Sequence, residues 1–251
     1  MTGRLPKSTL AAVILRSFLL QGSWNFERMQ NLGVLYALAP ALRLLFPERE
    51  LMAASQRHLL YFNTHPYLAA PVLGATLSLE EQTAQGLAGG MGVAEFKGMI
   101  MAPYAAIGDA LFWGGLRPLA AGVALFFAVK GSLWAPVVLL VLFNGPHLWV
   151  RCLGLLRGYR QGLGVVESIQ RRRLPDLAMR CKEATIVVLG VLSGFLVYAG
   201  CREQGVGEIW GAILLAPVFL LAFLVRKGWS PLLLVFLATG LVLALSRLIA
   251  A

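Results

Sequence analysis

Polar residues interrupt apolar stretches of this chain at several places. Asn63, Thr64 and His65 open a short apolar segment that ends at the adjacent carboxylates Glu80 and Glu81. A carboxylate that meets hydrocarbon is costly, so each one is expected to face protein, water or a ligand. Transporters place hydrogen-bonding side chains of these types on short, broken apolar segments to build substrate sites. The pattern therefore favours a substrate site in a transport protein.

A further interruption carries an acid and a tryptophan. Asp109 follows Gly108 in an apolar stretch, and Trp113 lies on the same stretch. Asp109 fits a ligand-binding acid and equally fits a helix cap. Trp113 fits a substrate surface but is also typical of packing or of an interface anchor. The Glu80–Glu81 pair has a simpler alternative too, as a solvated helix end.

The histidines and cysteines give no support to metal, redox or cofactor chemistry. The chain has three of each, with no CxxC and no His/Cys cluster. His58 and His147 are typical of packing or interfacial histidines, whereas His65 stays open between packing and function. No nucleophile–base pair is apparent, so a stand-alone membrane enzyme is disfavoured and no cofactor is expected.

The elements that must position these groups belong to a membrane protein. Of the 251 residues, 58% are hydrophobic and 14% are charged, where a soluble domain carries about 25% charged residues. Residues 184–200, 209–225 and 228–246 are uncharged windows, each near the length of a membrane-spanning helix. We therefore expect an all-α polytopic membrane protein with about three C-terminal transmembrane helices.

Charge is concentrated in one segment. Residues 151–182 hold eight basic and two acidic residues. Basic loops stay on the cytoplasmic side of membranes, so this segment is expected to be cytoplasmic. The loop at 201–208 is then expected to be external, as is the C-terminus at Ala251. The same rule accounts for the basic patch more simply than nucleic-acid binding does.

The middle and the N-terminal part have less regular patterns. Between residues 61 and 150, apolar runs are short and are interrupted by Gly and Pro, which favours broken or re-entrant helices over helices lying on the membrane surface. Residues 5–20 carry apolar residues at helical spacing. That segment fits an interfacial amphipathic helix and equally fits a helix packed on the protein.

Several short motifs follow one another along the chain. They are LQGSWNFERMQ at 20–30, FNTHP at 62–66, APVLGATL at 70–77, EEQ at 80–82, IGDALFWG at 107–114 with RP at 117–118, GS at 131–132, LFN at 142–144, GY at 158–159 with Gly162, and VRK with SPL at 225–232. In this order, the motifs resemble those of the IID components of the mannose/fructose/sorbose family of bacterial sugar phosphotransferase systems. The similarity runs from about residue 15 to about residue 245.

The resemblance implies one membrane subunit of a larger machine. The IID chain of that family pairs with a membrane IIC chain to form the sugar path, a cytoplasmic IIB protein phosphorylated on histidine transfers its phosphoryl group to the entering sugar, and IIA recharges IIB. The IID chain is not itself phosphorylated. The resemblance also implies a multi-pass protein of the inner membrane that forms a hetero-oligomer in the lipid bilayer and has no nucleic-acid partner.

With a sugar as the expected substrate, each polar group has a role. Asn63, Thr64 and His65 are expected to bind sugar hydroxyls, and Glu80, Glu81 and Asp109 to accept hydrogen bonds from them. Trp24 or Trp113 would cover the apolar face of the ring. Four residues of the first motif are expected instead at a partner interface: Gln21, Asn25, Glu27 and Arg28.

We expect a single IID-type domain over 1–251. Its regions would be an N-terminal helical region (1–60), a region of re-entrant elements (61–150), the basic cytoplasmic segment (151–183) and the C-terminal helices (184–251). Relative to that family, the connection at 201–208 is short, as is the stretch at 82–94. These departures support a second hypothesis, a non-transporting scaffold or regulatory subunit assembled with IIC.

Overall fold

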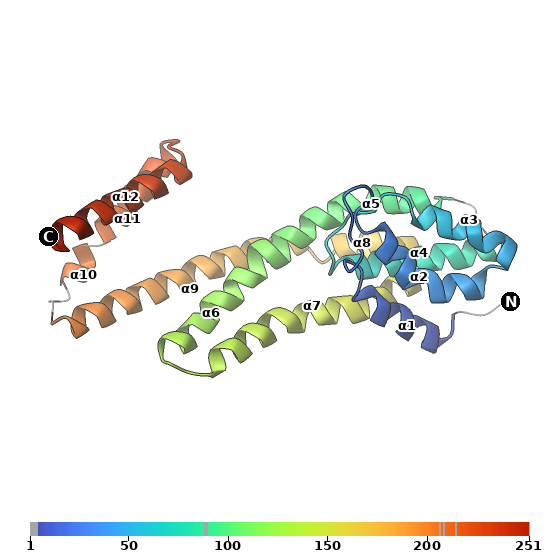
Figure 1. Cartoon of the computed structure of the whole chain (residues 1–251), viewed down its shortest axis with the longest axis horizontal. Coiled ribbons are helices and arrows are strands. Elements are labelled where there is room, and N and C mark those ends of the chain that lie inside the picture. Colours follow the sequence, from blue (N-terminus) through green and yellow to red (C-terminus); the bar gives the residue numbers. More distant parts are fainter. Residues whose placement is uncertain (1–4, 88–89, 206, 208, 214, 251) are drawn as a thin grey trace. The chain divides into compact units, whose positions relative to one another are not determined.

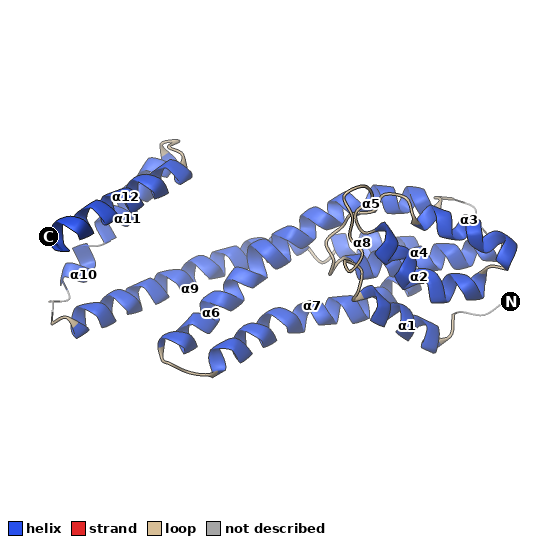
Figure 2. Cartoon of the chain, viewed as in Figure 1, coloured by secondary structure: helices blue, strands red, loops and turns tan. Residues whose placement is uncertain are grey.

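The computed structural model describes residues 5–87, 90–205, 207, 209–213 and 215–250. Helices make up the described secondary structure, apart from isolated bridges that Asn25 and Phe62 each form with Met29. The chain divides into two compact units, Met1–Leu189 and Gly190–Ala251. The division into units lies close to the expected start of the C-terminal helices; the four expected regions stay a prediction. The element order can be followed in Figure 1 and the helical content in Figure 2.

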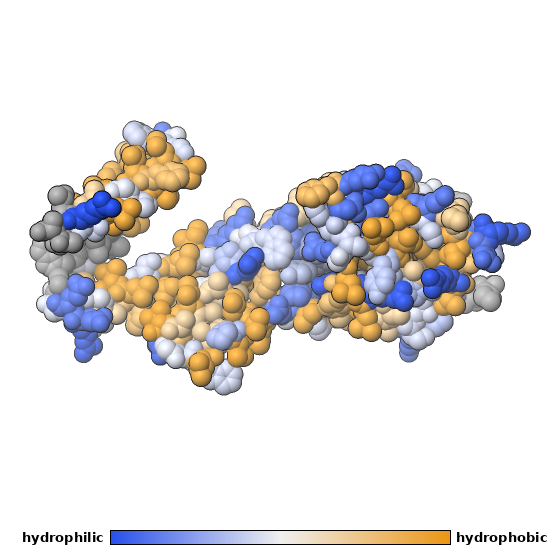
Figure 3. Space-filling view, in the orientation of Figure 1, coloured by the Kyte–Doolittle hydropathy of each residue, from blue (hydrophilic) through white to orange (hydrophobic). Residues whose placement is uncertain are grey.

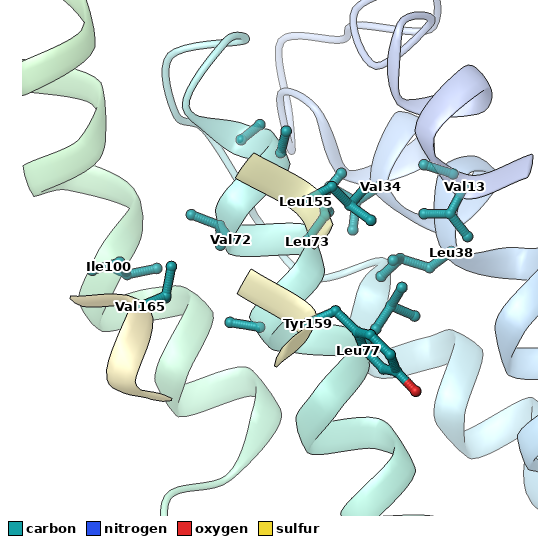
Figure 4. Close-up of a cluster of buried hydrophobic side chains, with 14 of the residues drawn as sticks. Val13, Val34, Leu38, Val72, Leu73, Leu77, Ile100, Leu155, Tyr159 and Val165 are labelled. Carbon is teal, nitrogen blue, oxygen red and sulfur yellow. The ribbon is translucent and has the colours of Figure 1, made fainter. Parts of the chain in front are cut away.

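The first unit begins with a bundle around one buried helix. It contains α1 (Lys7–Ser17), α2 (Asn31–Leu45), α3 (Glu48–His58) and α4 (Ala69–Ala84), with the end of α7 (Trp134–Gln161) crossing α4. Most of α4 is buried, because its small and aliphatic residues face protein on nearly every side. Figure 4 shows its side chains Val72, Leu73 and Leu77 among residues from α1, α2 and α7.

Two glycines allow α4 and α7 to touch backbone to backbone. A Cβ on Gly74 would overlap the carbonyl oxygen of Leu155, and one on Gly158 would overlap that of Pro71. Small residues at helix crossings permit this close approach in membrane proteins. The crossing fixes the N-terminal bundle on the long helix that carries part of the site described below.

A long helical hairpin extends from this bundle (Figure 1). Its first arm is continuous from Val93 to Val129 and consists of α5 (Val93–Gly108), the π-helix η1 (Asp109–Leu116) and α6 (Arg117–Val129). The second arm is α7. Hydrophobic residues cover much of the hairpin surface (Figure 3). Residues such as Leu140, Val141 and Trp149 are more than half exposed, as expected for side chains that face lipid.

The basic segment follows as the 3-10 turn η2 (Gly162–Gly164), α8 (Val165–Gln170) and the start of α9 (Leu174–Glu203). The second unit contains the end of α9, then α10 (Ile209–Ile213), α11 (Leu215–Arg226) and α12 (Pro231–Ala250).

The structure confirms an all-α protein with apolar helices but distributes them differently from the expectation. Among the described residues, three helical stretches are long and apolar enough to cross a membrane: Val93–Val129, Trp134–Gln170 and Leu174–Glu203. Of the three C-terminal windows, the first lies in α9, the second is divided between α10 and α11, and the third lies in α12. The expected 201–208 loop includes residues 206 and 208, which lie outside the described residues.

The expected breaks within residues 93–150 are absent from these arms of the hairpin. Pro103, Pro118 and Pro146 all lie within helical stretches. Pro118 follows the π-helix, where the backbone hydrogen-bond pattern is already altered and an N–H can be missing without ending the helix. For residues 5–20, the structure agrees with a helix packed on the protein, because α1 packs on α2 and buries Leu10 and Val13.

Candidate functional site

Gln30 holds the loop that carries Asn63, Thr64 and His65. Its side chain is buried; it donates from Nε2 to the Thr64 carbonyl at 2.8 Å and accepts from the Thr64 N–H at 3.1 Å. The Gln30 backbone N–H donates to the Phe62 carbonyl at 2.9 Å. An amide side chain that pairs with both the backbone N–H and the carbonyl of one residue fixes the orientation of that residue. This fixed loop turns His65 toward the first arm of the hairpin.

The π-helix η1 presents Asp109 and Trp113 to the same histidine. His65 Nε2 lies 4.0 Å from Asp109 Oδ1, and the rings of His65 and Trp113 are 5.2 Å apart. Gly108 permits this approach, since a Cβ there would overlap the His65 side chain. A π-helical turn is rare and is often found at functional sites. Three predicted residues, one from the loop and two from η1, therefore meet.

The surrounding rings form a continuous group, which we call the aromatic cluster. The Tyr67 ring stacks on His147 with centroids 4.1 Å apart, and the His65 ring stacks on Phe112 at 5.2 Å. Further ring contacts join these pairs to one another. Its members are His65, Tyr67, Phe112, Trp113, Phe143 and His147.

Two arginines border the cluster. Arg117 lies over Trp113 at 5.6 Å, and Arg151 lies over Tyr67 at 5.8 Å. Arg151 also donates to the Ser17 carbonyl at 2.7 Å, which ties α7 to the end of α1. Cations over aromatic faces are attracted by the ring quadrupole. The aromatic cluster is therefore bordered by fixed positive charge.

Several buried polar atoms around the cluster have no hydrogen-bond partner among the described residues. They are Thr64 Oγ1, His65 Nε2, His147 Nδ1 and Arg151 Nε. Unpaired buried polar groups are uncommon in proteins because each costs free energy. Their gathering beside aromatic rings is the arrangement expected of a site that hydrogen-bonds a ligand.

Burial and hydrogen bonding determine the protonation state of His65. Burial lowers the pKa of His65 to about 4, even though the Asp109 carboxylate opposes that shift. The ring is therefore neutral at neutral pH. Its Nδ1 faces the Tyr67 backbone N–H at 3.3 Å and accepts from it, so the proton lies on Nε2 and faces Asp109. A hydroxyl placed between them would accept from His65 and donate to Asp109.

The site is open on the acid side. The Asp109 side chain is 62% exposed and Trp113 is 38% exposed, whereas His65 is buried. Asn63 is half-buried in the same loop. Another surface is therefore needed to enclose a ligand here.

Glu80 belongs to a separate buried network. Its carboxylate accepts from Arg57 through both oxygens and from His58 Nε2 at 2.8 Å. Lys97 donates to His58 Nδ1 at 3.2 Å and to the Arg57 carbonyl at 2.8 Å. Three helices, α3, α4 and α5, are joined in this way. We call these four residues the buried charge network.

The protonation states within this network are mutually consistent. Burial lowers the pKa of His58 despite its bond to Glu80. Burial alone would raise the pKa of Glu80, but the hydrogen bonds from Arg57 and His58 hold it below its usual value. His58 is thus neutral, with its proton on Nε2 and its Nδ1 accepting from Lys97.

Glu81 points to a different side of α4 from this network. Tyr159 donates to Glu81 Oε2 at 2.7 Å, and the Leu5 backbone N–H donates to the Tyr159 hydroxyl at 2.8 Å. The two glutamates therefore contact different elements, and neither hydrogen-bonds a residue of the aromatic cluster. Their assignment to substrate stays a prediction.

The first motif forms a surface turn. Asn25 and Met29 exchange backbone hydrogen bonds, and the Asn25 side chain accepts from the Arg28 N–H at 2.8 Å. Glu27 pairs with Arg28 at 3.2 Å, and Gln21 is exposed. The Trp24 ring packs edge-on against Phe26 and has no ring contact with the aromatic cluster within the described ranges.

This turn borders a groove and leaves Phe26 88% exposed. Asn25, Glu27 and Arg28 line that groove together with Asn31, Leu32 and Leu59. An exposed phenylalanine on a polar rim fits a contact surface, so the assignment of the four motif residues to a partner interface stays a prediction with this support.

The sequence did not predict the roles of Gln30, Tyr67, Phe143, His147 and Arg151. Gln30, Tyr67 and Phe143 lie in or next to the motifs, which was the available signal. The signal for His147 and Arg151 was weaker: they are polar residues spaced four apart on an apolar helix. Across the parts of the chain described here, no group of three or more His, Cys, Asp or Glu residues is placed to hold a metal ion.

Long apolar helices and a polar aromatic site at their base define a multi-pass membrane protein with a candidate substrate site. The sequence pattern of the mannose/fructose/sorbose family IID component of the phosphotransferase system matches residues 4–202. The chain belongs to this family and is a membrane subunit of a sugar phosphotransferase system.

Named relatives agree with this assignment. The chain is 41% identical over 192 residues to the mannose-specific EIID component of Escherichia coli K12, covering 75% of this chain and 68% of that protein. It is 32% identical over 253 residues to the fructose permease IID component of Bacillus subtilis 168, covering 92% of each. The sorbose-specific EIID component of Klebsiella pneumoniae is 35% identical over 191 residues, with 75% and 70% covered.

Solved structures agree as well. One, described as a membrane protein, superposes with a TM-score of 0.73 at 34% identity and covers 96% of this chain and 97% of the other. A second, from the cryo-EM structure of the mannose transporter ManYZ with microcin E492, gives 0.60 at 32% identity, with 99% and 98% covered.

Proposed function

We propose that this chain forms, with a IIC partner, the translocation path for a mannose-type sugar. In this scheme, phospho-IIB phosphorylates the sugar during import and IIA recharges IIB. The single observation that carries the sugar site is the His65–Asp109 gap beside Trp113. The neutral His65 Nε2–H and the exposed carboxylate are 4.0 Å apart, too far for a direct hydrogen bond and suited to a bridging hydroxyl.

A hexose could make two kinds of contact in this site. One hydroxyl would accept from His65 and donate to Asp109, while the Trp113 ring would cover an apolar face of the sugar. Thr64 Oγ1 and Asn63 would supply further hydrogen bonds at the loop. We assign Glu80 a structural role, because it holds α3, α4 and α5 together. Glu81 and Trp24 stay predicted sugar contacts.

The open side of the site supports a role for the IIC partner. Asp109 and Trp113 are too exposed to enclose a sugar by themselves. The structurally similar chain described above comes from the mannose transporter ManYZ, whose name joins two components. IIC would therefore complete the site, and the turn with Gln21, Asn25, Glu27 and Arg28 offers a second contact surface.

The proposed orientation follows from charge. The basic segment at 151–182 is placed in the cytoplasm of an inner-membrane protein, and the C-terminus is placed outside. This orientation presents the arginine-rich side to the compartment in which IIA and IIB act.

Phosphoenolpyruvate-dependent sugar phosphorylation by the complex reconstituted with IIC, IIB and IIA tests the site. We expect Asp109→Ala to lose most activity, about tenfold to a hundredfold, because the sugar hydroxyl that donates to Asp109 would lose its acceptor. Asp176→Ala is the matched control, since its side chain is also 62% exposed but pairs with Arg173. Equal effects of both changes, at equal subunit abundance, would remove the site assignment. A natural complex with no phosphorylation activity would favour the non-transporting scaffold.

A further inference from the structure

A second surface lies where the apolar part of α7 meets its basic part. A groove there is formed by the start of α4, by α7, by α8 and by the beginning of α9. Val150, Val165 and Ile169 give it apolar walls, and Arg157 and Arg172 provide its cations. None of the described residues that line it is acidic.

The two arginines are free of carboxylates, unlike their neighbours. Arg171 pairs with Glu167 at 2.6 Å, and Arg173 with Asp176 at 3.7 Å. Within the described ranges, neither Arg157 nor Arg172 has a carboxylate within ion-pair distance. The local acids are therefore used by arginines outside the groove, and the positive charge inside it is uncompensated.

The position along α7 indicates what the groove faces. Most residues before Arg151 on this helix are apolar, and they include the exposed Leu140, Val141 and Leu148. Beyond Arg151 the helix becomes basic. Trp149 lines the groove at this change and is 62% exposed. Tryptophan is enriched at the boundary between hydrocarbon and lipid headgroups.

We propose that this groove binds one anionic phospholipid. The apolar walls would hold an acyl chain, and Arg157 with Arg172 would hold the phosphate. Basic pockets between helices at a membrane surface bind acidic headgroups by this chemistry. The ligand is distinct from the sugar, and the groove shares no lining residue with the aromatic cluster. A free anion would gain nothing from the apolar walls, so the occupant is a lipid.

The test measures lipid retention by native mass spectrometry on the full chain in complex with IIC, released from nanodiscs. The nanodiscs contain equal phosphatidylglycerol and phosphatidylcholine with matched acyl chains. We expect preferential retention of one phosphatidylglycerol. The double change Arg157→Gln with Arg172→Gln should lower this preference roughly 25-fold, because each cation near an anionic surface contributes roughly a fivefold factor.

The controls separate the groove from general charge. Arg171→Gln with Arg173→Gln removes the same charge outside the groove and should change the preference less than about twofold. Arg157→Lys with Arg172→Lys should retain most of it. Equal losses in the 157/172 and 171/173 glutamine pairs, or no preference in the natural chain, would overturn the proposal. So would displacement of the lipid by glycerol phosphate, which would indicate a simple anion site.

A second readout does not depend on the arginine variants folding. Phosphatidylglycerol with brominated acyl chains should quench the tryptophan fluorescence of the natural chain more than brominated phosphatidylcholine does. Trp149→Phe should abolish that difference. An unchanged difference in Trp149→Phe would place the bound lipid elsewhere and contradict the proposal.

Discussion

At the scale of single residues, the two adjacent acids at the end of α4 contact different elements. Neighbouring residues on a helix point about 100° apart, so Glu80 reaches Arg57 and His58 while Glu81 reaches Tyr159. The sequence predicted that each carboxylate needs a partner. It did not predict that protein groups hydrogen-bond both, because α3 and α7 are brought to α4 only by the tertiary fold.

The buried charge network gives a stability prediction. Glu80→Gln removes the charge of a fully buried carboxylate that pairs with the partly buried Arg57. We expect a loss of about 3 kcal/mol, seen as a lower thermal unfolding temperature in detergent. Glu167→Gln is the control, because its partner Arg171 is exposed and surface pairs contribute little. Similar unfolding temperatures for the two variants would contradict the structural role of Glu80.

Histidine burial gives a pH prediction. The pKa values of His58 and His65 are lowered in the folded chain, that of His65 to about 4, and that of Glu80 is lowered too. A depressed folded pKa means that the unfolded chain takes up protons first, so stability is full above about pH 6.5 and falls as the pH drops.

We therefore expect the unfolding temperature to decrease between pH 7 and pH 5. His65→Gln should remove part of this decrease, since its share extends down to about pH 4. The same variant should keep substantial sugar phosphorylation, because glutamine retains an N–H donor for the bridging hydroxyl. An unfolding temperature that is constant or rises toward pH 5 would contradict the assigned histidine states.

At the scale of elements, helical patterning could be predicted but its continuity could not. Hydropathy identified the all-α class and the apolar stretches, and the motifs identified the loop and η1 residues that meet at His65. The Gly and Pro residues between 61 and 150 suggested breaks, yet η1 carries the helix from Asp109 to Leu116. The π-helical turn and the Gln30 clamp depend on contacts distant in sequence, which local patterns do not encode.

The α4–α7 crossing gives a prediction about glycine. Gly158→Ala would place a Cβ on the Pro71 carbonyl oxygen and should separate the two helices, lowering the unfolding temperature and displacing Arg151 from Tyr67. Gly145→Ala is the control on the same helix, because nothing lies within 4 Å of its added Cβ. It should stabilise slightly, since alanine favours helix over glycine by up to about 1 kcal/mol. Equal behaviour of the two variants would exclude a tight crossing.

At the scale of the whole molecule, the two units differ in what they contain. The first carries the aromatic cluster, the buried charge network and the lipid groove. The second consists of apolar helices with highly exposed side chains such as Phe219 and Phe236. Exposed apolar helices are stable in lipid or against another chain. The protein is therefore expected to be monodisperse in mild detergent when co-expressed with IIC, and aggregated or inactive alone. A monodisperse, sugar-binding lone chain would contradict this.

The orientation of the chain gives the last prediction. Residues 151–182 carry an excess of six positive charges, whereas the last residues after Lys227 carry only Arg247. The positive-inside rule then places the basic segment in the cytoplasm and Ala251 outside. Single cysteines at Arg172 and Ala251, introduced after removal of the three native cysteines, should react with an impermeant maleimide on intact cells only at position 251. After membrane disruption both should react, which shows that position 172 is accessible. Labelling of position 172 on intact cells would reverse the orientation and move the proposed lipid groove to the outer leaflet.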